Sequence, residues 1–74
     1  MFTQHDMPIT RAQIAKLMAT GKVHEVENGG MDEGRFFVHL LDGLSYPQPY
    51  FGQRTKSFGD YREAAAMLKR VVRA

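Results

Sequence analysis

The sequence predicts an α+β fold in which two helices pack on one face of a three-stranded antiparallel sheet, in the chain order α-β-β-β-α. Two segments, one near each end, carry helix-capping residues followed by apolar residues at helical spacing. Three runs between them suggest strands and are separated by turns that contain glycine or proline. Because 74 residues suffice for one domain only, we expect a single domain at 10–74 after a flexible segment at 1–9.

The first helix is expected at 10–20. Thr10 is a favourable N-cap residue, and Gln13 follows it at the spacing of a capping box. Ile9 and Ile14 occupy the two positions of a hydrophobic staple, in which a residue before the cap packs on the helix. These signals together define where the helix begins.

The three expected strands differ in their apolar surface. KVHEVE at 22–27 is short and ends at NGGMDEG (28–34), which is expected to be a turn. RFFVHLL at 35–41 is apolar on both faces, so it should be the central strand. YFGQRTKSF at 50–58 alternates, and it can pair only after the preceding prolines, which lack the donor that a β-ladder needs.

The second helix is expected at 60–73, with Asp60 as its N-cap and Glu63 at the capping-box position. Its apolar residues fall on one face at 3.6 residues per turn, and its cations fall on the other. The predicted core combines apolar positions of both helices and the central strand: Ile14, Leu17, Phe36, Val38, Leu40, Ala65, Leu68 and Val72.

Charge is unevenly distributed, although the net charge is only +2. Acidic residues concentrate at 24–43, including Asp32 and Glu33, whereas basic residues concentrate at 50–74. The basic side chains are compatible with one continuous phosphate-binding track along the third strand and second helix, or with an ordinary solvated helix face. The candidate nucleic-acid-binding residues are Arg54, Lys56, Arg62, Lys69, Arg70 and Arg73.

The segment SYPQPYFGQRTK at 45–56 places Tyr46, Tyr50 and Phe51 around two prolines. Exposed rings beside cations would form a stacking platform for single-stranded nucleic acid or a contact site for a protein. The alternative is a lid, because aromatic side chains are the largest source of buried area in a small core. We expect a mixture in which some rings are buried and one tyrosine is exposed.

The sequence shows no catalytic or metal-binding motif. It has no cysteine, and His5, His24 and His39 lack the spacing of zinc ligands. No hydroxyl residue stands in a nucleophile motif, so we expect a protein that is not an enzyme and uses neither metal nor cofactor. Titratable side chains that converge in a closed pocket around His24 and His39 would contradict this expectation.

The order of elements and one motif resemble the double-stranded RNA-binding domain. A glycine-containing first hairpin precedes the pattern S-x-x-x-x-R-E-A-A-A at 57–66, and the likeness runs over about 10–72. It implies the α-β-β-β-α fold and contacts with RNA. In that family two lysines follow the serine; here Phe58 and Gly59 replace them, and only the later cation, Arg62, is retained. Acidic GGMDEG also replaces the family's Gly-Pro-x-His hairpin.

Two functions remain open on these observations. One is a small binding or regulatory module that contacts nucleic acid through the third strand and second helix. The other is a protein-interaction module, such as an adaptor or inhibitor encoded by a phage or plasmid, that uses the aromatic segment or the acidic turn. No apolar run approaches the ~18 residues of a membrane span, and the first residues lack a signal-peptide pattern. We therefore expect a cytoplasmic protein with neither a membrane nor a small-molecule substrate as its partner.

Overall fold

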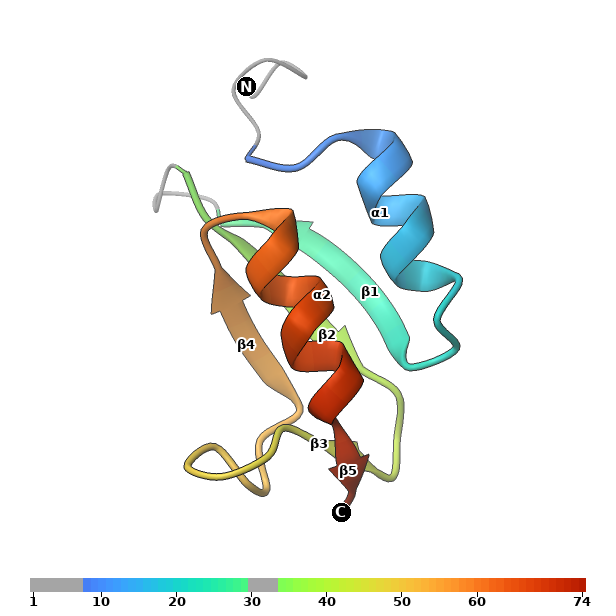
Figure 1. Ribbon diagram of the computed structural model, residues 1–74, viewed down its shortest axis with the longest axis vertical. Helices are drawn as coiled ribbons and strands as arrows, with labels where there is room; N and C mark the ends of the chain where they lie inside the picture. The colour runs from blue at the N-terminus through green and yellow to red at the C-terminus, as the bar shows by residue number, and fades with distance from the viewer. Residues whose placement is uncertain (1–7, 30–33) are drawn as a thin grey trace.

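The computed structural model describes residues 8–29 and 34–74; His5, Asp32 and Glu33 lie outside these ranges. The described elements, in chain order, are α1 (Arg11–Met18), β1 (Val23–Asn28), β2 (Phe36–Leu40), β3 (Leu44–Ser45), β4 (Thr55–Phe58), α2 (Tyr61–Arg70) and β5 (Val72–Arg73) (Figure 1). The predicted α+β class, with a three-stranded antiparallel sheet and two helices, is confirmed. Within the described ranges, no helix is long and apolar enough to cross a membrane.

β2 is the central strand of the main sheet, as its apolar sequence predicts, with β1 and β4 as antiparallel neighbours. Val38 pairs with Val26 on one side and with Lys56 on the other, so these three side chains point to the same face. The next pair along the strand, His39 and Thr55, points to the opposite face. Alternation thus divides the sheet into a helix-covered face and an open face.

Both helices begin at the predicted caps. The Thr10 hydroxyl accepts a hydrogen bond from the Gln13 N–H (3.1 Å), and the Gln13 side chain accepts one from the Thr10 N–H (3.0 Å), which completes the capping box. The Asp60 carboxylate accepts from the Glu63 N–H (2.9 Å). The Glu63 carboxylate, however, accepts from the Gly59 N–H (3.3 Å), one residue before the position that a capping box uses.

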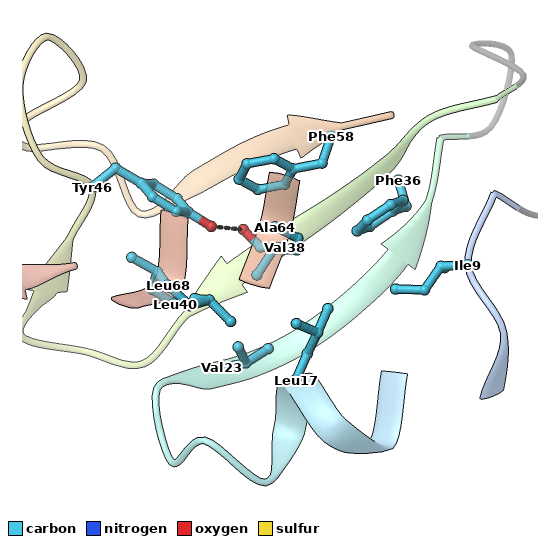
Figure 2. Packing of buried hydrophobic residues seen from close by; sticks show 10 residues of the cluster. All are labelled: Ile9, Leu17, Val23, Phe36, Val38, Leu40, Tyr46, Phe58, Ala64 and Leu68. Atoms are coloured by element: carbon cyan, nitrogen blue, oxygen red, sulfur yellow. Dashed lines mark hydrogen bonds between the residues drawn. The ribbon is translucent and has the colours of Figure 1, made fainter. Parts of the chain in front are cut away.

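The core lies between the helices and the helix-covered face of the sheet (Figure 2). Its buried hydrophobic residues are Ile9, Leu17, Val23, Phe36, Val38, Leu40, Tyr46, Phe58, Ala64 and Leu68. Ile14 and Ala65 are only partly buried against this core, and Ala64 is buried instead of Ala65. Ile9 is 1% exposed, so the packed part of the chain begins inside the segment that was expected to be flexible.

α2 ends at Arg70, three residues earlier than predicted. Val71 has an extended backbone (φ −58°, ψ 138°), and Val72 with Arg73 forms β5, which pairs with β3 in a second, two-stranded sheet. Consecutive β-branched valines favour extended backbone over helix. The predicted burial of Val72 is therefore wrong: its side chain is 38% exposed, because the residue has left the apolar face of the helix.

Candidate nucleic-acid interface

α2 carries three exposed cations, Arg62, Lys69 and Arg70. In the part of the chain that the structure describes, none of them lies within ion-pair distance of a carboxylate. Arg62 and Lys69 project within about 20° of each other around the helix at 100° per residue. Arg70 is turned toward β4. The helix thus presents positive charge that no described residue neutralises.

A groove of about 380 Å³ lies between β4 and α2, which contact each other. The charged and aromatic residues that line this β4–α2 groove are Arg35, Tyr50, Lys56, Phe58, Glu63 and Arg70. Three cations therefore share the groove with a single carboxylate. Glu63 lies in the first turn of α2 and Arg70 is the last helical residue, so the two mark opposite ends of the groove, about 10 Å apart along the helix axis.

Lys56 reaches the groove from the helix-covered face of the sheet. It lies opposite the buried Val38 in the ladder. Its Nζ is 3.6 Å from the centroid of the Tyr50 ring and 5.7 Å from that of the Phe58 ring. A cation over an aromatic face is attracted to the ring by about 0.5–2 kcal/mol. The two rings therefore hold the ammonium in place without neutralising its charge.

Arg35 is a groove residue that is not among the predicted binding residues. Its Nε donates to the Ser57 hydroxyl (3.2 Å) and its Nη2 donates to the Ser57 carbonyl oxygen (3.0 Å). These bonds fix the guanidinium along the edge of β4, although Arg35 comes from the acidic half of the chain. The only sequence signal that could have identified it is its isolation as the single cation within 24–43.

Arg54 and Arg73 lie away from the β4–α2 groove. Arg54 immediately precedes β4 in the sequence and forms an ion pair with Asp42. Arg73 lies in β5, opposite Leu44. The predicted continuous track from Arg54 through Lys56 to the helix is therefore not formed. Arg54 lines the groove on the open face, whereas Lys56 lines the β4–α2 groove. A contact between either arginine and nucleic acid stays a prediction.

Tyr46 is fully buried and belongs to the core. Its hydroxyl donates to the Val38 carbonyl oxygen (3.1 Å), and its ring meets the Phe58 ring edge-on at a centroid distance of 6.0 Å (Figure 2). Burial also raises the pKa of the Tyr46 phenol above its ordinary value. The prediction that Tyr46 stacks on a ligand or partner is wrong, since no part of the ring reaches the surface.

The other two rings of the aromatic segment lie nearer the surface. Tyr50 is half-buried beneath Lys56, and Phe51 is 53% exposed. The segment therefore covers the core with the Tyr46 ring and exposes the Phe51 ring to solvent. The mixture of buried and exposed rings is as expected, but the most exposed ring belongs to the phenylalanine and not to a tyrosine.

A second polar cluster lies on the open face of the sheet. The Thr55 hydroxyl is 3.0 Å from His39 Nδ1, and His39 Nε2 is 2.7 Å from Glu27 Oε1. This order of hydroxyl, imidazole and carboxylate resembles the nucleophile, base and orienting acid of acyl-transfer enzymes. Local sequence patterns do not reveal this pairing, because the three residues come from three different strands.

The surroundings of the Thr55–His39–Glu27 chain favour a structural role. The side chains of His39 and Glu27 are 28% and 55% exposed, whereas catalytic charge stabilisation relies on a site that excludes water. His39 and Thr55 also line a groove of about 630 Å³ together with His24 and Asp42. The Asp42 side chain is 96% exposed, so this groove does not exclude water from its charged groups. Cross-strand polar pairs of this kind stabilise neighbouring strands. That the protein is not an enzyme stays a prediction.

Metal binding finds no support in the described ranges, where no three His, Cys, Asp or Glu side chains come together in a way that could hold an ion. Comparison with models of known families, with curated proteins and with solved structures finds no match to this chain. The structure has two helices and a small antiparallel sheet, and no family match supports the resemblance to the double-stranded RNA-binding domain further.

Proposed function

We propose that the protein is a small non-catalytic module that binds nucleic acid through α2 and the β4–α2 groove. The observation that carries this proposal is that Arg62, Lys69 and Arg70 share one helix and have no carboxylate partner among the described residues. A phosphate backbone suits such a surface, because each neutralised phosphate releases condensed counterions. Lys56 adds a further charge, which its aromatic neighbours hold inside the groove.

The proposed contacts differ from those that the family resemblance implies. The two positions that are lysines in the double-stranded RNA-binding domain are Phe58, which is buried in the core, and Gly59, which has no side chain. Arg62 is the retained cation of that pattern. Most of the positive charge comes instead from the last turn of α2 and from Lys56. We therefore expect phosphates both along the exposed cations of α2 and in the groove, and not only at the first turn of the helix.

Titration of labelled oligonucleotides at ~50 mM salt tests the proposal. The Arg62→Ala, Lys69→Ala double variant should bind more weakly to all sequences, since phosphate contacts carry no sequence information. It should also reduce the slope of log affinity against log salt by about two units, because each phosphate contact contributes about 0.9.

The matched control is the Arg11→Ala, Lys16→Ala double variant, which removes the same net charge. Both residues are exposed on α1 and lie outside the β4–α2 groove, so the control should lose less affinity. Equal losses in the two double variants would show that net charge alone attracts the ligand, which contradicts the assigned surface. If the wild type binds no oligonucleotide at this salt concentration, the proposal is wrong.

A protein partner is the second candidate, favoured by the 53% exposure of Phe51. Aromatic anchors of this kind often dominate protein–protein contacts. Such a contact should depend little on salt, whereas phosphate binding should weaken steeply. A pull-down from cell lysate, repeated with Phe51→Ala, would identify a partner that needs this ring.

A further inference from the structure

The loop between β3 and β4 is closed by its own backbone hydrogen bonds. The Tyr46 N–H donates to the Gln53 carbonyl oxygen (3.0 Å), and the Gln53 N–H donates to the Tyr50 carbonyl oxygen (3.0 Å). The Tyr50 N–H in turn donates to the Pro47 carbonyl oxygen (2.8 Å). Phe51 lies within this closed loop and is 53% exposed. Its chain neighbour Tyr50 lines the β4–α2 groove, so the backbone of Phe51 lies next to a groove residue.

Positive charge in the groove is concentrated at the end next to this loop. Lys56 lies over the Tyr50 ring, and Arg70 has no carboxylate at ion-pair distance in the described part of the chain. The carboxylate of the groove, on Glu63, lies about two helical turns from Arg70 and accepts from the Gly59 N–H (3.3 Å). An anion is therefore attracted to the Lys56–Arg70 end of the groove.

We infer that the protein prefers single-stranded to double-stranded nucleic acid, with a phosphate at Lys56 and Arg70 and an adjacent base stacked on Phe51. This inference rests on the proposed function and specifies its ligand. In a duplex the faces of the bases are covered by neighbouring bases, so only an unstacked base can lie on the exposed ring. Because every base has a π-face, we expect little preference for sequence.

The test compares the wild type with Phe51→Ala on three probes of equal length: a mixed-sequence single strand, its duplex, and an abasic single strand that keeps only the sugar–phosphate backbone. The wild type should bind the mixed-sequence single strand best. Phe51→Ala should weaken that binding by about 5- to 150-fold, the range for one lost stacking contact. Binding to the duplex and to the abasic strand should not change. Phe51→Trp should retain single-strand binding, because the indole ring also stacks.

The matched control is Met18→Ala, which removes an apolar side chain that is 41% exposed on α1. It should bind all three probes like the wild type, and thermal melts should show that both variants remain folded. Equal affinity for single strand and duplex, together with no effect of Phe51→Ala, would overturn the inference and leave the proposed function intact. If the wild type binds none of the three probes, both the inference and the proposed function are wrong.

Discussion

The β4–α2 groove and the open face of the sheet both display polar side chains, but they differ in how their charged groups are partnered. On the open face, one ring nitrogen of His39 is hydrogen-bonded to the Thr55 hydroxyl, and the other is hydrogen-bonded to the Glu27 carboxylate. In the groove, Lys56 lies over an aromatic ring, and Arg70 has no carboxylate within ion-pair distance among the described residues. The open face pairs its polar groups with one another, whereas the groove leaves Lys56 and Arg70 without a carboxylate partner among the described residues, although Arg35 is bonded to Ser57.

This difference separates side chains that support the fold from side chains that a partner could use. A net contribution of about 0.5–1.5 kcal/mol per hydrogen bond makes the open-face network part of the stability of the sheet. An exposed cation without a counter-charge adds little to folding and repels its cationic neighbours. We therefore expect substitutions on the open face to change stability, and substitutions in the groove to change binding.

The largest expected effect arises in the core, on which both surfaces depend. Leu68 is 2% exposed on the side of α2 that packs into the core. Leu68→Ala should lower the free energy of unfolding by about 2–5 kcal/mol and remove the groove together with the helix. Chemical denaturation measures the loss, with the exposed Lys69→Ala as a control that should stay within about 0.5 kcal/mol of the wild type. A loss below about 1 kcal/mol for Leu68→Ala would contradict the described packing of α2.

Tyr46→Phe should have an intermediate effect, because it removes the hydroxyl that satisfies the Val38 carbonyl oxygen. We expect a loss of about 1 kcal/mol in the free energy of unfolding. The raised pKa of the phenol adds a pH dependence. Above about pH 10 the unfolded chain releases this proton while the folded chain keeps it, so wild-type stability should fall as pH rises.

Denaturation curves measured across this alkaline range check both parts of the prediction. Tyr46→Phe should lack the alkaline loss that the buried phenol causes, whereas Tyr50→Phe, at a half-buried ring, should keep it. Identical alkaline slopes for the wild type and Tyr46→Phe would show that the Tyr46 phenol is not buried as described.

The smallest expected effect tests the comparison most directly. Thr55→Val removes one hydrogen bond of the open-face network and should cost about 0.5–1 kcal/mol in stability, with no change in oligonucleotide affinity. Arg70→Ala in the groove should do the reverse, weakening binding while stability stays nearly constant. Hydrolysis of an activated ester by the wild type, abolished in Thr55→Val, would instead show that the Thr55–His39–Glu27 chain is catalytic.

Local sequence patterns predicted the elements of the fold because capping and alternation depend on near neighbours. Thr10 and Asp60 begin their helices as predicted, since a cap needs only the next three residues. The apolar run of β2 indicated its central place, because apolar residues concentrate in a strand that has a neighbour along each edge.

The rest depends on contacts between residues that are distant in sequence. The burial of Tyr46 depends on the place of its ring beside Phe58, which no local pattern contains. Arg35 reaches the groove only because β2 pairs with β4, and His39 meets Thr55 through the same pairing. The sequence therefore identified the cations of α2 and Lys56 as candidates. It did not indicate which of these side chains come together in one groove.

The two-stranded sheet of β3 and β5 has a consequence for the order in which the molecule opens. It pairs Leu44 with Arg73, and the Ala74 N–H donates to the Gly43 carbonyl oxygen (2.8 Å). Closing so long a stretch of chain costs entropy, and a two-residue pairing returns little energy, so amide protons here should exchange with solvent before those of β2. Each opening would free the residues that follow Arg70, whereas the last turn of α2 stays anchored by the buried Leu68. The C-terminal strand can thus detach while the core and the groove stay in place.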